Sequence, residues 1–267
     1  MSWLDALDFD PTSSWLAMGT RALGGEPWLV DDPSRAALLE LRTQLIAERP
    51  NEVLATPASA VTAAADVVAL VEASDVAVEQ SDDNALARLG RSVVEDLVIL
   101  RRGDREWEFE AGVVCFPSRW RLGAKIGRPL REIHEPTTGY DPELADRVTS
   151  LLDRLGERIV RRRNWFVHPD AALFQPDRPT APERVVGAAT ALDELVLRSE
   201  RQTLRALPAS GRVLFTIATQ QAPLRTVVAD PDRALRFARY VREAAAADLR
   251  HRGVSDEQGA VLLALFE

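Results

Sequence analysis

Residues 195–219 contain two strand-like runs separated by a tight turn, and this pattern constrains the fold more than any other in the chain. The first run covers residues 195–204 and the second covers residues 213–219. Residues 208–211 between them read Pro-Ala-Ser-Gly, a combination typical of a turn between neighbouring antiparallel strands. The sequence therefore predicts an antiparallel sheet built around this hairpin.

The order of the remaining elements predicts an α+β fold with helical additions at both ends. We expect strands at residues 93–101, 106–116, 162–168, 194–206 and 212–220. We expect helices at residues 35–49, 58–73, 84–90, 121–134, 141–155, 231–250 and 255–266. Two strands, a helical crossing and three strands is the element order of a five-stranded antiparallel PAS-type sheet. We therefore expect a single domain over residues 1–267, with a helical part at 1–90, a sheet core at 91–222 and C-terminal helices at 230–267.

Composition excludes several classes of protein. The net charge is −8, which makes nucleic acid an improbable ligand because duplex-binding domains carry a basic face. No apolar run approaches the ~18 residues that a membrane-spanning helix needs, and the acidic N-terminus does not resemble a secretory signal. The single cysteine, Cys115, excludes an internal disulfide and a cysteine-built metal cluster. We expect a cytoplasmic protein that binds neither nucleic acid nor membrane.

The segment 116–134 is dense in unusual residue types and ends in one of only three histidines, His134. Pro136 follows and biases the chain out of helix, so His134 is expected at a helix end. An imidazole in that position suits an axial haem ligand, with its second nitrogen held by a carbonyl or a carboxylate. The alternative is a histidine stabilised by the helix C-terminal dipole. No glycine-rich nucleotide loop and no paired-histidine zinc motif occurs in the chain.

Two further basic segments can each be interpreted either as part of a binding site or as solvent-exposed structure. In the strand at 198–205 both alternating faces are polar, with Arg198 and Glu200 on one face and Arg201 on the other. Such a strand is either the wall of a polar pocket, where arginine could pair with a carboxylate, or a solvated edge strand. The basic run 161–163 leads into Asn164 and Trp165, and it either grips an anionic group or is a solvated strand entry.

These segments, taken together, resemble the haem-dependent oxidative N-demethylase family, over about residues 16–245. The matching pieces are Met18-Gly19, the helix at 35–49, Val94-Glu95-Asp96-Leu97, Val114-Cys115-Phe116-Pro117-Ser118-Arg119-Trp120, Lys125-Ile126-Gly127-Arg128-Pro129-Leu130, Ile133-His134, Gly139-Tyr140, Arg163-Asn164-Trp165, Arg198-x-Glu200-Arg201-Gln202-Thr203-Leu204, Leu207-Pro208, Gly211 and Phe215-Thr216-Ile217. Ala206 and Thr137-Thr138 depart from the family pattern, and these departures put the identity of the substrate in doubt.

The resemblance implies a haem-binding PAS-type fold and a subunit similar to that of a dimethylamine monooxygenase. It implies that the chain binds haem b, activates O₂ and demethylates a small secondary amine with release of formaldehyde. Electrons would come from NAD(P)H through a separate flavin and iron–sulfur reductase, which agrees with the lack of nucleotide motifs in this chain.

The resemblance also implies a set of site residues. His134 is the expected metal ligand, and Glu200 and Lys125 are the expected catalytic residues. Lys125 is the only lysine among 33 basic residues, and we expect its ammonium group to reach a haem propionate or an oxygen-derived species. The expected cofactor-binding residues are His134, Lys125, Arg119, Tyr140, Asn164, Trp165, Arg198 and Arg201.

Two alternatives stay open at this stage. His168, at a strand end before a proline, is the second candidate for the axial ligand, ahead of His251 in a charged helix and of Cys115 in an apolar run. The chain is either an enzyme, a haem-binding PAS sensor or carrier without turnover, or a haem-free structural descendant. The absence of an attached output module favours an enzyme.

Overall fold

The computed structural model describes residues 2–13, 18–134, 140–180 and 183–266. Trp15 and the segment from Glu135 to Gly139, which includes Pro136, lie outside the described residues. The predicted end of a helix at Pro136 therefore falls outside the described residues.

The described residues form an α+β fold around one antiparallel sheet, as predicted, but the predicted number of five strands is wrong. The sheet has seven strands in the order β1-β5-β6-β7-β3-β4-β2. The five predicted strands are all present, and each edge is extended by a strand of two residues, too short to show any alternation of polarity. The strands are β1 (Arg21–Ala22), β2 (Leu54–Ala55), β3 (Asp96–Arg102), β4 (Trp107–Val113), β5 (Val160–His168), β6 (Val196–Leu207) and β7 (Arg212–Pro223).

The hairpin of β6 and β7 forms the centre of the sheet. Twelve residue pairs join the two strands, from Val196 opposite Pro223 to Leu207 opposite Arg212. The turn contains Gly211 with a φ of 67°, a left-handed conformation that glycine adopts without steric cost. The turn chemistry and the register thus agree with the sequence-based prediction.

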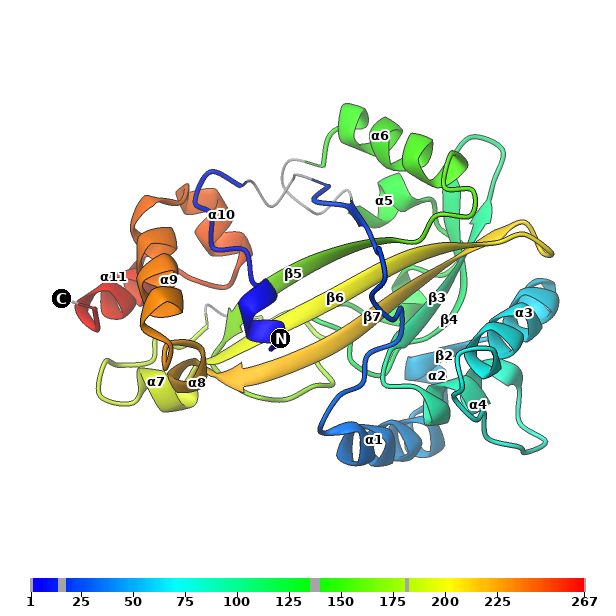
Figure 1. Ribbon diagram of the computed structural model, residues 1–267, viewed down its shortest axis with the longest axis horizontal. Helices are drawn as coiled ribbons and strands as arrows, with labels where there is room; N and C mark the ends of the chain where they lie inside the picture. Colours follow the sequence, from blue (N-terminus) through cyan, green and yellow to red (C-terminus); the bar gives the residue numbers. More distant parts are fainter. Residues whose placement is uncertain (1, 14–17, 135–139, 181–182, 267) are drawn as a thin grey trace.

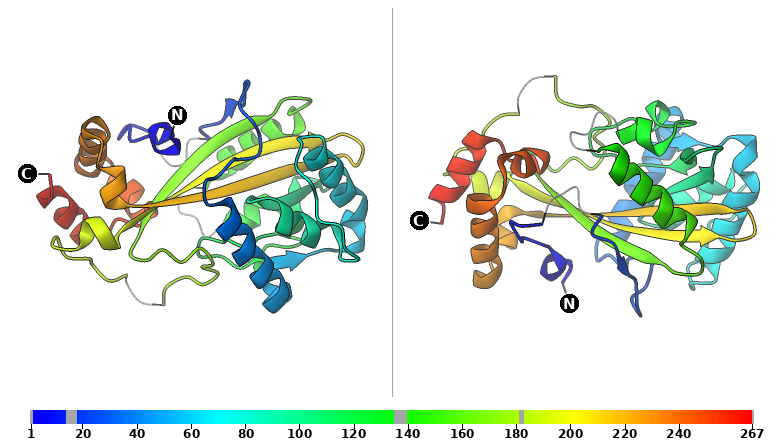
Figure 2. Two further views of the ribbon diagram at one scale, coloured as in Figure 1. Left: turned by 60° about the horizontal axis from the view of Figure 1, so that its bottom comes forward. Right: turned by 90° about the horizontal axis from the view of Figure 1, so that it is seen from above.

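Helices cover both faces of the sheet and one of its ends (Figures 1 and 2). The first group packs on one face: α1 (Arg35–Glu48), α2 (Pro50–Val53), η2 (Ala58–Ala60), α3 (Val61–Glu72) and α4 (Ala85–Ser92). The second group packs on the other face: η3 (Leu122–Ala124), α5 (Leu130–His134) and α6 (Pro142–Asp153). The third group gathers at the end of the sheet: η1 (Trp3–Ala6), α7 (Ala191–Glu194), α8 (Leu224–Val227), α9 (Pro231–Glu243), α10 (Ala246–His251) and α11 (Asp256–Ala264). No helix within the described ranges is both long enough and apolar enough to span a bilayer.

Two predicted helices are interrupted. The helix expected at 121–134 is reduced to η3 and α5, because Gly127 takes a φ of 75° and Pro129 follows. The helix expected at 231–250 breaks between α9 and α10, where Ala244 and Ala245 are extended. Neither alanine is a helix breaker by itself, so this second interruption has no local sequence signal.

Asp96, the first residue of β3, joins three segments in the interior. Its carboxylate accepts hydrogen bonds from the amides of Cys115 (2.7 Å) and Phe116 (3.0 Å), and it pairs with Arg42 of α1 (2.7 Å). The side chain of Arg42 is fully buried and also donates to the carbonyl of Gly90. A buried ion pair is costly to break because the remaining charge loses its partner and stays away from water.

Replacing Asp96 with alanine should lower the free energy of unfolding by about 3–5 kcal/mol, since Arg42 and two amides would lose their acceptor together. Urea denaturation followed by far-UV circular dichroism measures this change. Glu52→Gln is the matched control, because its ion pair with Arg49 is exposed and should contribute less than about 1 kcal/mol. Equal effects of the two substitutions would contradict this account of the core.

Glu95, next to Asp96, lies at the wall of a cavity of about 450 Å³ between residues 27–31 and 74–77. Its side chain is 1% exposed and accepts a hydrogen bond from the amide of Val30 (2.6 Å). Burial raises the pKa of this carboxyl group to about 7, from an ordinary value of 4.5. The folded state therefore favours the protonated form of Glu95.

The pKa shift of Glu95 predicts a pH dependence of stability. The contribution of Glu95 to the free energy of unfolding is fully present below pH 4.5, the ordinary pKa of the group. This contribution is lost as the pH rises towards about 7. Glu95→Gln stays neutral, so its unfolding free energy should gain about 3 kcal/mol relative to the wild type across that window. Urea unfolding at a series of pH values tests this. A constant difference between pH 4 and 8 would show that Glu95 does not titrate as argued.

Candidate functional site

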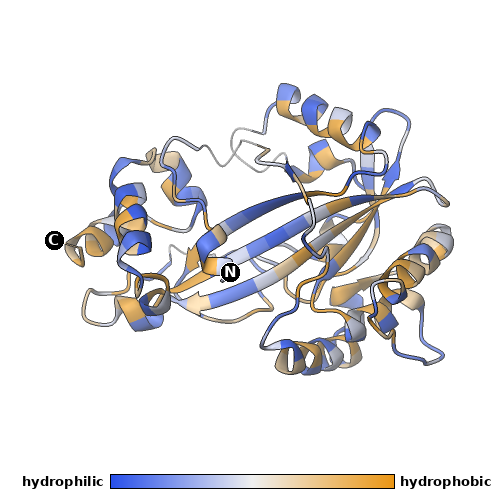
Figure 3. Cartoon of the chain, viewed as in Figure 1, coloured by the Kyte–Doolittle hydropathy of each residue, from blue (hydrophilic) through white to orange (hydrophobic). Residues whose placement is uncertain are grey.

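The sheet has a polar stretch where β5 and β6 run side by side, and Figure 3 shows hydrophilic colour along both strands. Asn164 lies opposite Glu200 and Phe166 lies opposite Arg198, so these four side chains share one face of the sheet. We call this face the pocket face, after the polar pocket wall that the sequence predicts for this strand. Farther along the same face, Val160 and Leu204 pack against the helical segments η3, α5 and α6. The pocket face is therefore the face covered by the segment that contains Lys125 and His134.

His134 ends α5, and a hydrogen bond fixes the orientation of its ring. Its Nδ1 lies 2.7 Å from the carbonyl oxygen of Leu130, one turn earlier, and the ring stacks on Tyr140 at 4.6 Å between centroids. Because a carbonyl oxygen only accepts, Nδ1 carries the proton and Nε2 keeps its lone pair. Burial, with the cations Lys125 and Arg162 nearby, lowers the pKa of His134 to about 4. The imidazole is therefore neutral at pH 7 and keeps a lone pair on Nε2, the form in which a histidine can bind a metal.

Positive charge accumulates beside His134. The ammonium group of Lys125 lies over the Trp120 ring at 4.1 Å from its centroid, and burial lowers the pKa of Lys125 to about 8. Arg162, on the pocket face of β5, makes no hydrogen bond or ion pair within the described part of the chain, and burial lowers its pKa. Glu200 is the carboxylate that interacts with both cations. This cluster therefore has more positive than negative charge, which favours an anionic ligand group.

Glu200 is held in place by its neighbours on β6. It is 8% exposed, accepts a hydrogen bond from Gln202 (3.2 Å) and lies 3.6 Å from Nε of Arg198. Arg198 is fully buried and donates to the carbonyls of Phe116 (2.5 Å) and Leu173 (3.1 Å). The two terminal nitrogens of Arg198 are thus occupied by backbone carbonyls, and its Nε faces Glu200 without forming a hydrogen bond.

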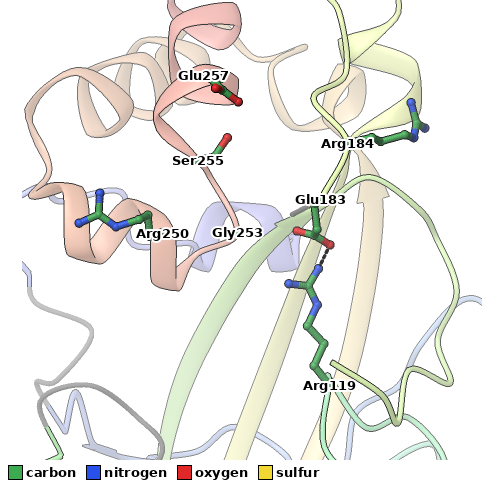
Figure 4. A pocket seen from close by; sticks show the side chains of 7 residues that line it. All are labelled: Arg119, Glu183, Arg184, Arg250, Gly253, Ser255 and Glu257. Atoms are coloured by element: carbon green, nitrogen blue, oxygen red, sulfur yellow. Dashed lines mark hydrogen bonds and ion pairs between the residues drawn. The ribbon is translucent and has the colours of Figure 1, made fainter. Parts of the chain in front are cut away.

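Arg119 and Asn164 lie near the pocket face but are paired with other residues. Arg119 takes a φ of 64°, ion-pairs with Glu183 and donates to Nδ1 of His168 at 3.2 Å. The same ion pair lines a separate cavity of about 220 Å³ near α10 and α11 (Figure 4). The amide oxygen of Asn164 accepts from Arg252. Neither side chain contacts His134 through a bond that the described residues show.

Trp165 and Arg201 lie on the opposite face of the sheet. Trp165 is buried against Phe9, with ring centroids 5.1 Å apart, and donates from Nε1 to the carbonyl of Asp8. Arg201 donates to the carbonyls of Pro27 (2.6 Å) and Trp28 (3.1 Å). The structure therefore stacks His134 on Tyr140 and places Lys125 within electrostatic reach of both His134 and Glu200. Trp165 and Arg201 lie on the other face of the sheet.

Two residues near His134, Arg162 and Trp120, are missing from the expected site residues, although the run 161–163 that contains Arg162 is a candidate for binding an anionic group. Arg162 shares its face with Asn164, two residues later, so strand alternation alone could have placed it beside Glu200. Trp120 precedes η3 in an irregular segment, and no periodicity predicts that its ring meets Lys125.

Two of the other candidate donors, His168 and Cys115, differ from His134 in their hydrogen bonding or protonation. Nδ1 of the buried His168 faces the guanidinium of Arg119, which only donates, so Nδ1 is the acceptor and Nε2 carries the proton. If Nε2 of His168 bound a metal, the proton would have to move to Nδ1, and His168 would lose its hydrogen bond from Arg119. Burial raises the pKa of Cys115 to about 12, which keeps it a thiol. His251 borders Phe166, and burial lowers its pKa to about 4.

The comparison with known families identifies the family of this chain. A family model described as "Haem-dependent oxidative N-demethylase, alpha subunit-like" matches residues 69–262. The matched range includes β3 to β7, the pocket face and every residue of the cluster around His134. The chain therefore belongs to the haem-dependent oxidative N-demethylase alpha subunit-like family.

Proposed function

We propose that this chain binds haem b against the pocket face, where Nε2 of His134 would bind the iron, and that it demethylates a small secondary amine. The observation that carries the proposal is the Nδ1–Leu130 hydrogen bond, which leaves Nε2 of a neutral imidazole available. The net reaction consumes one O₂, two electrons and two protons. An N-methyl group leaves as formaldehyde, the amine regains an N–H bond, and the second oxygen atom becomes water.

The residues around His134 fit a haem group. Haem b carries two carboxylates, and Lys125 and Arg162 are cations with one shared carboxylate neighbour, Glu200. We propose that these two side chains hold the propionates, because anionic groups would offset their unbalanced charge. When bound, the haem supplies an iron that reacts with O₂ and accepts electrons one at a time.

The chain's own side chains orient the substrate and handle protons. Leu130 fixes the plane and the tautomer of the His134 ring. Arg198 and Gln202 hold Glu200, whose carboxylate can pair with a protonated amine. Because its pKa is about 8, Nζ of Lys125 can release and regain a proton close to neutral pH.

We propose a separate reductase as the electron donor. The chain contains no nucleotide-binding loop of the usual sequence, and the family description names an alpha subunit. A partner that carries flavin and an iron–sulfur cluster and oxidises NAD(P)H would supply the two electrons.

Replacing His134 with alanine should abolish haem binding or shift the Soret band, while the far-UV circular dichroism spectrum stays that of the wild type. His168→Ala is the matched control, since its Nε2 is protonated and its ring belongs to the Arg119 network. Absorption spectra of the ferric and ferrous forms make the comparison. An unchanged spectrum in His134→Ala, with loss in His168→Ala, would transfer the ligand role to His168.

A measurement of turnover distinguishes an enzyme from a haem-binding sensor or carrier. With a surrogate reductase and NADH, the haem-loaded chain should consume O₂ and release formaldehyde only when a secondary methylamine is added. Tight haem binding with no amine-dependent O₂ consumption would leave a sensor or carrier as the function. The lack of a Soret band would refute haem binding altogether.

A further inference from the structure

The cavity of about 450 Å³ between residues 27–31 and 74–77 lies apart from the pocket face. Its lining includes Trp28 and Val93, which belong to the core that the first helix group forms on the opposite face of the sheet. Some lining residues are exposed (Pro27, Asp31, Asp75 and Ala77) and others are buried (Trp28, Val93 and Glu95). The cavity therefore has a rim open to solvent and a buried floor, and its volume suits a small molecule.

Hydrogen bonds hold the two walls of this cavity in place. Arg201 of β6 donates to the carbonyls of Pro27 (2.6 Å) and Trp28 (3.1 Å), which fixes one wall on the sheet. Trp28 donates from Nε1 to Oγ of Ser74 (2.8 Å), which joins that wall to the other. A ligand that enters a cavity preformed in this way loses little free energy to the ordering of its walls.

Glu95 places a carboxyl group at the buried floor of the cavity. It accepts a hydrogen bond from the amide of Val30 (2.6 Å), and it forms no ion pair with any residue that the structure describes. The three cations around it have other acceptors: Arg42 pairs with a carboxylate of β3, Arg201 binds the wall carbonyls, and Arg35 binds the carbonyl of Ser92. A buried carboxyl group without an ion pair can take a cation from a ligand as its partner.

The rest of the lining suits a cation with an apolar body. Asp31 and Asp75 add two carboxylates at the rim, whereas Arg35 is the one basic residue of the lining. The apolar surface comes from Leu29, Val30, Val76, Ala77 and Val93. An anion would meet an excess of negative charge here, and the described residues include no group of His, Cys, Asp and Glu side chains placed to hold a metal ion. The lining therefore favours an organic ammonium ion.

We propose that this cavity binds a small organic ammonium ion, with its nitrogen paired to the Glu95 carboxylate and its apolar part against Val76 and Val93. The ring of Trp28 lines the same cavity and offers a further contact for a cation. The inference goes beyond the proposed function, because the site lies on the other face of the sheet from His134 and takes no part in the haem chemistry.

Binding at this site should release a proton. Burial raises the pKa of Glu95 to about 7, whereas an ammonium ion pairs with the ionised carboxylate. The ionised fraction of Glu95 grows about tenfold between pH 6 and pH 8, so the affinity for the ammonium ion should rise by about the same factor.

Isothermal titration calorimetry of the full chain with benzylammonium chloride tests the proposal. The probe is a primary amine and stays protonated at pH 6 and pH 8, so its own charge does not change. The wild type should bind it about tenfold more tightly at pH 8 than at pH 6. Buffers of different ionisation enthalpy report the released proton. Benzyl alcohol, a neutral molecule of the same shape, and sodium chloride are the control ligands and should not bind.

Four variants locate the site. Glu95→Gln keeps an acceptor for the Val30 amide but should weaken binding about tenfold or more, because a charged partner is lost. Ala77→Trp fills the cavity from its exposed rim and should block binding without a change in the buried floor. Glu110→Gln is the matched control, since this buried glutamate pairs with Arg212 and does not line the cavity. His134→Ala should bind the probe as the wild type does.

Equal binding of benzylammonium and benzyl alcohol, or an affinity that is the same at pH 6 and pH 8, would overturn the proposal. An unchanged affinity in both Glu95→Gln and Ala77→Trp would also overturn it. Loss of binding in His134→Ala but not in Ala77→Trp would place the amine on the pocket face, and the cavity would then not be the site. A chain without a Soret band that still shows the expected titration would refute the proposed function and preserve this site.

Discussion

The fully buried guanidinium of Arg198 is the interaction on which the arrangement of the pocket face depends. A charge in the interior must be matched by hydrogen-bond acceptors or by an opposite charge. Arg198 finds these in the carbonyls of Phe116 and Leu173 and in the nearby Glu200. The hydrogen bonds of Arg198 thus hold the residues after β4 and the loop after β5 against β6. Its charge also keeps the carboxylate of Glu200 on the pocket face.

Asp96 also anchors the residues that follow β4. It binds the amides of Cys115 and Phe116, while Arg198 binds the carbonyl of Phe116. The chain between β4 and η3 is therefore anchored at its beginning by two buried side chains of opposite charge. Trp120 lies in this segment, and Lys125 follows directly after η3.

The sequence predicts the sheet well because strand alternation and turn chemistry are local. The strand at 198–205 has polar residues on both faces, and the alternation correctly separates Glu200 from Arg201. The resemblance grouped Arg201 and Trp165 with the cofactor-binding residues, but the structure places them on the face opposite to His134. The edge strands and the break after α9 carry no local signal, so no reading of the sequence predicts them.

The choice between the two histidines shows what only tertiary structure supplies. His134 and His168 each end a secondary-structure element and each precede a prolyl segment by at most two residues. Their hydrogen-bond partners differ in kind: a carbonyl of the same helix for His134, and the guanidinium of Arg119, distant in sequence, for His168. These partners set opposite tautomers and leave Nε2 free only in His134.

The central claim is that the haem iron binds at the pocket face through His134. An anomalous difference map of the haem-loaded crystal, recorded at the iron absorption edge, locates the metal without reference to any variant. We expect a single iron peak at coordination distance from Nε2 of His134, on the side of the sheet that carries Arg162 and Glu200. A peak beside His168, or on the face that carries Arg201 and Trp165, would contradict it.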